Sequence, residues 1–483
     1  MPWHALCWHP CVEGVAGGRS GAPLESPTVT DDVLTSDQIT AIKDRVSALM
    51  PQVQADLEAL TRIPSVSLGS FDQQRIEESA DAVAALLRAE GLDVEIVREG
   101  GRPAVIGHID GPDGSPTVTL YAHHDVQPPG DDALWDSPPF EPTVRDGRLY
   151  GRGAADDKAG VMAHVAALRA HSGNLPVGVT IFVEGEEEIG SDSLLTILDR
   201  HGEKLRADAI VLADSGNWDI GEPALTTTLR GMIRVVVTVT TLDHGVHSGM
   251  FGGAVPDAVT VLMRLLATLH DEEGNVTVDG LKSGEASELE YSEERLRLES
   301  GLLEGVSLIG SGSLLTRMWN KPAITTIGFN APSVETASNT LVPSASAKVS
   351  MRIAPDEDPR TAYDLLTAHL EKHVAWGAKL AIHLDDEGPG FAANADGPVY
   401  DQARAAFADA WGVQPVDIGV GGSIPFVARF AEKFPDAGIL VTGVEDPDAR
   451  AHGANESLHL GEFERVCQAE ALLLARLGGL PRG

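Results

Sequence analysis

Apolar residues in the first half of the chain follow two patterns. Some recur with the spacing of a helix, and others form short continuous runs. The helical spacing predicts helices over 35–62, 74–90, 158–171 and 194–201. Short runs rich in valine and isoleucine predict strands between them, over 94–97, 104–109, 118–122, 178–183 and 209–213. This alternation is typical of an α/β domain with helices on both faces of a sheet.

The pattern changes near Gly221, where β-branched residues become more frequent. We expect strands over 233–240, 323–327, 347–353 and 380–384, with helices over 257–270 and 361–374. These elements predict a separate α+β unit, inserted from about 226 to 392. A charged stretch over 283–320 interrupts the unit, and we expect it to form a helical excursion.

The α/β pattern returns toward the end of the chain. A helix over 399–411, a strand over 438–442 and a final helix over 461–477 follow the insertion. We therefore expect the chain to divide into 35–225, 226–392 and 393–483, with the first and last parts forming one domain.

Residues 1–34 show neither the helical spacing nor the short apolar runs. Their mixture of Trp, His, Cys, Gly and Pro predicts a disordered extension. Cys7 and Cys11 have no second pair of ligands, so accidental spacing explains them better than a metal site does. Thr35 and Gln38 match a capping box, in which two side chains satisfy free backbone N–H groups at a helix start. The folded chain is expected to begin there.

The composition limits the possible partners. The 483 residues include 36 basic and 72 acidic residues, a formal net charge of −36. This charge repels phosphate backbones and anionic lipids, so we expect no nucleic-acid or membrane partner. The apolar runs fall short of the roughly 20 residues that cross a membrane. Three cysteines cannot form a disulfide framework, which suits a reducing, cytoplasmic compartment.

Side chains able to bind metal follow three predicted strands. They are His123 and Asp125 after 118–122, Glu187 and Glu188 after 178–183, and Asp214 after 209–213. Ligands of open α/β sheets gather in the crevice outside the carboxyl ends of the strands. We therefore expect these side chains to share a site.

Asp156 is the candidate centre of that site. It lies in a turn-like stretch before the helix predicted over 158–171. A carboxylate has two oxygens and can bridge two cations about 3.5–4 Å apart, an arrangement used for hydrolysis. His452 adds an imidazole from a loop near the end of the chain. Taken singly, these residues would be ordinary loop or cap residues, but the mixed set suits Zn²⁺ or Mn²⁺ better than Mg²⁺ or Ca²⁺.

Two neighbouring pairs indicate how such a site would divide its work. Asp125 is two residues from His123, so both side chains can face one side and the carboxylate can orient the imidazole. Acidic runs are usually solvated, but Glu187 and Glu188 directly follow an apolar strand, which crowds like charges unless cations compensate them. One of the two can then bind metal while the other accepts a proton from water.

Together these motifs resemble a family of di-zinc metallopeptidases that includes carnosinase-like cytosolic dipeptidases, carboxypeptidase G, acetylornithine deacetylase and succinyl-diaminopimelate desuccinylase. The resemblance covers nearly everything from about residue 40 onward. It is carried by Tyr-Ala-His123-His-Asp125-Val-Gln-Pro, Gly-Arg-Gly-Ala-Ala-Asp156-Asp-Lys, Glu-Gly-Glu-Glu187-Glu188-Ile-Gly-Ser, Asp214, Gly-Val-His247-Ser-Gly and His452-Gly-Ala-Asn455-Glu456. Asp-Val-Gln-Pro128 and the stretch from Trp135 to Phe140 most resemble the dipeptidase branch.

The resemblance implies a zinc-peptidase-like catalytic domain with helices on both faces of a mixed sheet. It also implies an inserted α+β, ferredoxin-like lid that forms a homodimer. Two divalent metal ions per chain are expected, foremost Zn²⁺, with Mn²⁺ or Co²⁺ as alternatives. By resemblance, His123, Asp156 and Asp214 would hold one ion, and Asp156, Glu188 and His452 the other.

Further roles follow from the same resemblance. Glu187 would be the general base that takes a proton from the bridging water and passes it to the leaving amine, while Asp125 would orient His123. His247 matches the lid histidine that helps to stabilise the tetrahedral oxyanion, often across the dimer. Arg352 resembles the lid arginine that grips a substrate carboxylate, although a strand-edge charge is its structural alternative.

The loop from Gly421 to Pro425 resembles the glycine-rich loop that lines the family's substrate pocket, through Gly422 and Ser423. Val420 departs from the dipeptidase pattern, which has an acidic residue there that can meet a substrate's amino group. The family also has a cis peptide after its bridging aspartate. The sequence favours hydrolysis of dipeptides or short peptides, with an N-acyl-amino-acid deacylase on the same two metals as the nearest alternative.

Two other classes of protein fit parts of this pattern. A catalytically silent binding protein would be favoured by the loss of Glu187 or a ligand, and none is missing. A two-metal phosphoesterase would use similar ligands, but the acidic composition opposes a phosphorylated substrate.

Overall fold

The computed structural model describes residues 34–284, 289–422 and 424–481. The extension predicted over 1–34 therefore lies outside the described residues apart from Leu34, and so does Ser423. Within the described ranges we find no helix with the length and apolar character needed to span a membrane.

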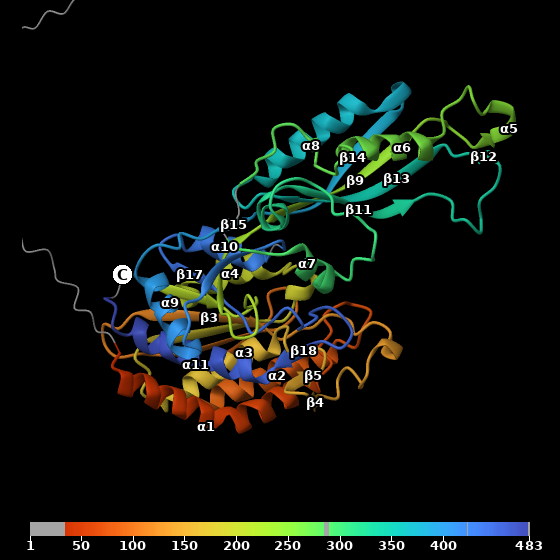
Figure 1. The fold of residues 1–483 in the computed structure, drawn as a ribbon. Coiled ribbons are helices and arrows are strands. Elements are labelled where there is room, and N and C mark those ends of the chain that lie inside the picture. The colour runs from red at the N-terminus through yellow and green to blue at the C-terminus, as the bar shows by residue number, and fades with distance from the viewer. Residues whose placement is uncertain (1–33, 285–288, 423, 482–483) are drawn as a thin grey trace, which may run out of the picture. The chain divides into compact units, whose positions relative to one another are not determined.

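The larger sheet is mixed and, among the described residues, contains nine strands in the order β1-β2-β6-β3-β7-β17-β8-β15, with β16 paired to β8 (Figure 1). Its centre is parallel and consists of β6 (Gly178–Glu184), β3 (Thr117–His123), β7 (Ala209–Leu212) and β17 (Gly438–Val441). An antiparallel pair, β1 (Asp93–Val97) and β2 (Ala104–Ile109), forms one edge. The other edge contains β8 (Ala224–Leu229), β15 (Phe391–Ala392) and β16 (Val416–Val420).

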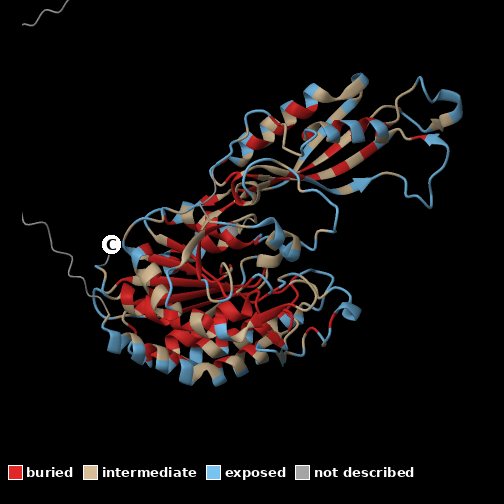
Figure 2. Ribbon diagram, viewed as in Figure 1, coloured by how far each residue is buried: buried red, intermediate tan, exposed pale blue. Residues whose placement is uncertain are grey.

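Helices cover both faces of this sheet because alternate strand residues point to opposite sides. In β3, Leu120 packs into one apolar cluster and Tyr121 into the other. The first cluster includes α1 (Ser36–Thr61), α2 (Gln74–Ala89), α3 (Lys158–His171), α9 (Pro398–Trp411) and α11 (Leu460–Leu477). The second includes α4 (Leu194–Leu205) and α10 (Pro425–Lys433). Figure 2 shows the buried residues concentrated along the sheet and the inner faces of these helices. The predicted α/β class is confirmed.

A second sheet has the order β11-β13-β9-β14 and is antiparallel. Its strands are β9 (Gly231–Thr240), β11 (Ala323–Asn330), β13 (Ser344–Ile353) and β14 (Lys379–Gly388). Buried and half-buried residues alternate along β9, and the buried ones pack against α6 (Ala258–Leu266) and α8 (Pro359–His373). This is the α+β unit that the sequence predicts.

Short elements complete the described chain. A three-stranded sheet joins β4 (Thr143–Arg145), β5 (Arg148–Tyr150) and β18 (Ser457–His459), and a two-stranded one joins β10 (Val246–His247) and β12 (Thr340–Leu341). The short helices are η1 (Asp132–Leu134), η2 (Glu187–Ile189), α5 (Ser248–Phe251), η3 (Ala267–Leu269) and η5 (Ala375–Gly377).

The described residues of the stretch 283–320 are only partly helical. They include α7 (Glu293–Ser300) and a π-helical segment, η4 (Thr316–Asn320), joined by irregular chain. Tyr291 and Trp319 pack around Trp218, with ring centroids 5.8 and 6.1 Å from its own. The described part of this excursion therefore contains less helix than expected, and it contacts Trp218 through aromatic side chains.

Candidate metal centre

The carboxyl ends of three neighbouring strands bring the predicted ligands together. His123 is the last residue of β3, Asp214 lies two residues beyond β7, and Glu187 and Glu188 begin η2 after β6. Because β3 pairs in parallel with both β6 and β7, these ends lie at the same edge of the sheet.

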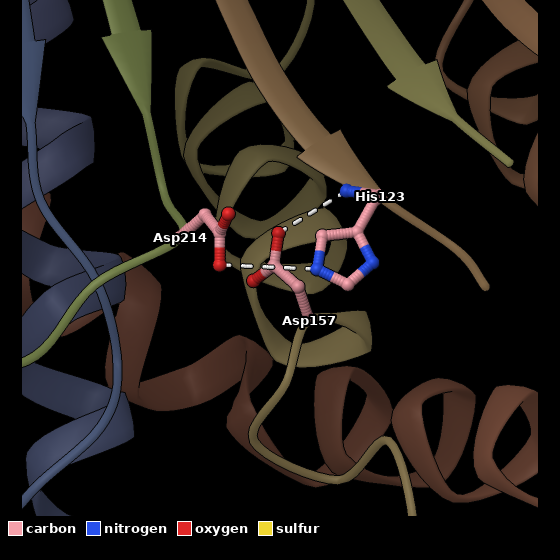
Figure 3. A group of neighbouring side chains, drawn as sticks. All are labelled: His123, Asp157 and Asp214. Carbon is pink, nitrogen blue, oxygen red and sulfur yellow. Dashed lines mark hydrogen bonds and ion pairs between the residues drawn. The ribbon is translucent and has the colours of Figure 1, made fainter. Parts of the chain in front are cut away.

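Two groups of potential metal ligands occupy this edge. Each group offers one ligand atom per residue, and these atoms lie within 4.8 Å of one another. The first group is His123, Asp157 and Asp214; the second is Asp156, Glu188 and His452. Figure 3 shows the first group, with Asp214 facing the ring of His123 and Asp157 facing its backbone nitrogen. Those contacts measure 3.8 Å and 3.2 Å.

Asp156 lies between the two histidines. Its Oδ1 is 3.1 Å from Nε2 of His123, and its Oδ2 is 3.0 Å from Nε2 of His452. Glu188 Oε2 lies 3.4 Å from the same nitrogen of His452. Presenting one oxygen to each group is the arrangement that a bridging carboxylate requires. The Asp156–Asp157 peptide is cis, as the family resemblance led us to expect.

The His123 ring is held in an orientation that suits a metal ligand. Its Nδ1 lies 3.1 Å from the backbone oxygen of Asp125 and 3.4 Å from Oδ1 of the same residue. Its Nε2 is buried and faces the carboxylates of Asp156 and Asp214, at 3.1 and 3.8 Å, without a well-aligned hydrogen bond among the described residues. A histidine ligand usually has one nitrogen held by such an oxygen while the other faces the metal.

The electrostatics of the cluster also suit bound cations. Burial, reinforced by Asp214, raises the pKa of Glu187, and burial together with Asp156 raises that of Glu188 to about 9. Burial opposes ionisation of Asp156 too, but His123 and His452 outweigh it and lower the pKa of Asp156. So many carboxylates share this edge that divalent ions would relieve their mutual repulsion. The mixed nitrogen and oxygen donors fit Zn²⁺, Mn²⁺ or Co²⁺.

Asp125 also positions both glutamates of η2. Its two carboxylate oxygens accept the backbone N–H groups of Glu187 and Glu188, each at 3.1 Å. Gln127 then donates to the Glu188 carboxylate from its backbone at 3.1 Å and from its side chain at 2.7 Å. The base candidate and a ligand candidate are thus oriented from the loop that follows β3.

The other predicted site residues lie outside both ligand groups. His247 is exposed on β10, and its Nδ1 accepts the backbone N–H of Gly249 at 3.0 Å. Arg352 lies on β13, where burial lowers its pKa. Gly422 follows β16, and Ser423 lies outside the described residues.

Sequence reasoning missed two acidic residues of this region. Asp157 was not predicted as a ligand, although its position next to Asp156 was a signal. Glu445 belongs to the loop after β17, and its backbone pairs with Gly216, two residues beyond Asp214. Among the described residues, no hydrogen bond or ion pair engages its carboxylate. Burial, followed by Asp156 and Asp214, raises the pKa of Glu445.

Comparison with known proteins identifies the family. Residues 119–476 match the peptidase family M20/M25/M40. The chain belongs to this family. A cysteinylglycine-S-conjugate dipeptidase from Corynebacterium striatum is 36% identical to this M20 chain over 410 residues, covering 83% of the chain and 90% of the relative. A Beta-Ala-His dipeptidase from Rattus norvegicus is 30% identical over 400 residues, covering 79% and 81%.

Solved structures share the fold of this M20 chain. The dipeptidase Dug1p from Saccharomyces cerevisiae has a TM-score of 0.79 at 24% identity, covering 92% of the chain and 100% of the neighbour. Human carnosine dipeptidase 1 has a TM-score of 0.76 at 24% identity, covering 92% and 99%. The family predicted from the motifs is confirmed.

Proposed function

We propose that this M20 peptidase hydrolyses the peptide bond of dipeptides or short peptides with the help of two divalent metal ions. The observation that carries the proposal is the position of Asp156, which offers one oxygen to each of two histidine-containing groups. The similarity to proteins named as dipeptidases supports the same substrate class.

The proposed ligands combine these two groups with the position of Asp156 between His123 and His452. His123, Asp156 and Asp214 would hold one ion, and Asp156, Glu188 and His452 the other, with Asp157 near enough to assist the first set. When bound, the ions would polarise the scissile carbonyl and favour ionisation of water at the site. Zn²⁺ is the foremost candidate, followed by Mn²⁺ and Co²⁺.

Glu187 would act as the general base and then as the general acid. It would take a proton from the attacking water and give it to the amine nitrogen as the C–N bond breaks. Asp125 supports this role because it fixes the backbone of Glu187. Arg352 would bind the substrate carboxylate through its planar guanidinium, and Gly422 and Ser423 would line the pocket.

The proposed assembly is a homodimer. Residues 35–225 and 393–483 would form the catalytic domain, and 226–392 the lid and dimerisation domain. Met250, Phe251, Ile327 and Phe329 are exposed apolar residues of this segment, which suits a protein interface. His247 would stabilise the oxyanion in the partner's site. We also propose a cytoplasmic location.

Glu445 favours substrates with a free amino group. Its carboxylate belongs to the loop paired with the Asp214 loop and has no ion-pair partner among the described residues. A substrate ammonium could therefore pair with it, which would compensate for the valine at position 420. An N-acyl substrate has no such charge.

A matched substrate panel tests this function. Cys-Gly, β-Ala-His and their N-acetylated forms are incubated with the Zn²⁺-loaded and Mn²⁺-loaded protein. We expect the free dipeptides to be cleaved, and Glu445→Gln to lower kcat/KM for them by roughly 10- to 100-fold. Cleavage confined to acylated substrates would assign the protein to the deacylases, and cleavage of neither would contradict the proposal.

A further inference from the structure

Arg152 and Glu456 form an ion pair that is almost completely withdrawn from solvent. Their side chains are 1% and 0% exposed, and Nη1 of Arg152 donates to Oε2 of Glu456. Arg152 lies four residues before Asp156, and Glu456 lies four residues after His452. Because desolvating two charges is unfavourable, a buried pair is a poor source of stability by itself. Its position between two ligand-bearing loops points to another role.

Glu456 fixes the turn that carries Asp156. Its Oε2 accepts the backbone N–H of Gly153 at 3.1 Å, and its Oε1 accepts those of Ala155 and Asp156 at 3.0 and 3.2 Å. With Arg152, the carboxylate therefore has four donors. Three of them are main-chain groups of the turn, so they determine where the Asp156 side chain starts.

Arg152 extends the same contact to the loop that carries His452. Its Nη2 donates to the backbone oxygen of Gly453 at 3.0 Å. Three residues of this loop, Arg450, His452 and Asn455, have positive φ angles of 55°, 63° and 62°, which surrounding contacts must support.

Packing contributes little to the placement of His452. Its side chain is 60% exposed, whereas that of His123 is 1% exposed. His123 is fixed because it ends the buried strand β3. For His452, backbone hydrogen bonds such as the one from Arg152 to Gly453 must supply the missing restraint.

We propose that the Arg152–Glu456 pair is a positioning brace that sets the relation between Asp156 and His452, and so the metal affinity of the second ligand group. The inference rests on the proposed function, in which these residues hold a metal ion. The first ligand group takes two of its residues, His123 and Asp214, from β3 and the loop after β7, which the brace does not contact, so loss of the brace should affect that group less.

Zn²⁺ titration of the metal-stripped protein tests the brace. Arg152→Lys keeps the charge but loses the two-pronged guanidinium. Glu456→Gln keeps an oxygen for the turn but loses the charge. We expect both variants to bind one Zn²⁺ as the wild type does and the second roughly 10- to 100-fold more weakly, as is usual when residues behind the ligands are altered. Excess Zn²⁺ should restore the second ion.

Arg169→Met is the matched control. Arg169 pairs with Asp56 at 2.7 Å and Glu90 at 2.8 Å and joins α3 to α1 and the end of α2. This variant should lower the unfolding temperature while leaving both Zn²⁺ affinities unchanged. Unchanged affinities in both folded brace variants, or equal weakening in the control, would overturn the inference. A wild type that binds fewer than two Zn²⁺ would instead overturn the two-metal proposal together with the brace.

Discussion

Asp125 illustrates how one side chain can order several functional groups. Its carboxylate accepts the backbone N–H groups of Glu187 and Glu188 and lies 3.4 Å from Nδ1 of His123. A base candidate and two ligand candidates are thereby oriented from one buried position. This orientation is required for catalysis, because a proton is transferred only between groups held within hydrogen-bond distance.

The variant Glu187→Gln tests whether the Glu187 carboxylate is the general base. The amide cannot accept the proton of the attacking water, so kcat should fall by about 10²- to 10⁴-fold or more. Metal content should stay near two per chain, because Glu187 belongs to neither ligand group. Steady-state assays combined with metal analysis measure both quantities.

Glu186→Gln is the matched control for that substitution. The Glu186 carboxylate accepts the backbone N–H groups of Arg102 and Ser193, at 2.9 and 2.6 Å. It therefore stabilises the loop after β6 and has no proposed part in the reaction. Its turnover should stay within a few-fold of the wild type. Wild-type turnover by Glu187→Gln would refute the base assignment.

Three of the predicted ligands share a simple property, their position shortly after apolar strands. This property predicted a common sheet edge for His123, Glu188 and Asp214, and the parallel pairing of β3 with β6 and β7 provides it. It could not find Glu445, whose loop follows β17 without a recognisable ligand pattern. The sequence singled out Asp156 but did not predict that its neighbour Asp157 would lie within ligand distance of His123 and Asp214.

At the scale of elements, α3 and α11 are joined behind the site by a buried ion pair. His164 Nδ1 lies 2.7 Å from Glu470 Oε1, and its Nε2 lies 2.9 Å from the backbone oxygen of Tyr121 in β3. Burial opposes protonation of His164, but Glu470 outweighs it and raises the pKa of the imidazole. The pair thus connects two helices to the strand that ends at His123.

The raised pKa makes this connection pH-dependent. A raised folded-state pKa stabilises the protein fully below the unfolded value of about 6.5, and the contribution is lost as pH rises through the folded value. His164→Gln should therefore lower the unfolding free energy by roughly 2–4 kcal/mol at pH 6 and by less at pH 9. Denaturant unfolding of metal-stripped protein at both pH values measures the difference.

His171→Gln, on the same helix, is the control with the opposite sign. Burial lowers the pKa of His171, and its Nε2 lies 2.9 Å from the backbone oxygen of Ala471. Its stabilising contribution should be present above pH 6.5 or so and decline as pH falls. A His164→Gln effect that is equal at the two pH values would contradict the proposed protonation.

The longest helices were predictable from sequence, whereas the three-residue strands were not. The helix predicted over 158–171 coincides with α3, and that over 35–62 nearly coincides with α1. The short strands β4, β5 and β18 were missed, because three residues show no periodicity. β4 and β5 form a local hairpin, whereas β5 and β18 come from distant parts of the chain, and their pairing brings Glu456 next to Gly151.

At the scale of the whole molecule, the described chain contains one unit inserted into another. Leu229 of β8 pairs with Phe391 of β15, so the intervening segment leaves and rejoins the larger sheet at neighbouring positions. The change in periodicity near Gly221 predicted such an insertion. Its proposed use, a lid that serves the partner's site, depends on a contact between chains that one sequence cannot specify.

Mixing two inactive variants tests that use. If His247 serves the partner's site, a dimer of one Glu187→Gln chain and one His247→Ala chain retains one complete site. The two variants are mixed in equal amounts and allowed to exchange subunits. Half of the dimers should then contain one chain of each variant, and one of the two sites in each mixed dimer is intact. The mixture should therefore recover about a quarter of the wild-type activity. Each variant alone is the control. Failure to recover activity despite mixed dimers would exclude action across the dimer.

The proposed chemistry rests on metal dependence. Metal-stripped protein is assayed for dipeptide cleavage while Zn²⁺ or Mn²⁺ is added back in known amounts. Cleavage should be negligible at first and should reach a plateau at about two ions per chain. Cleavage that persists without metal, or that neither ion restores, would contradict the two-metal hydrolase proposed for this chain.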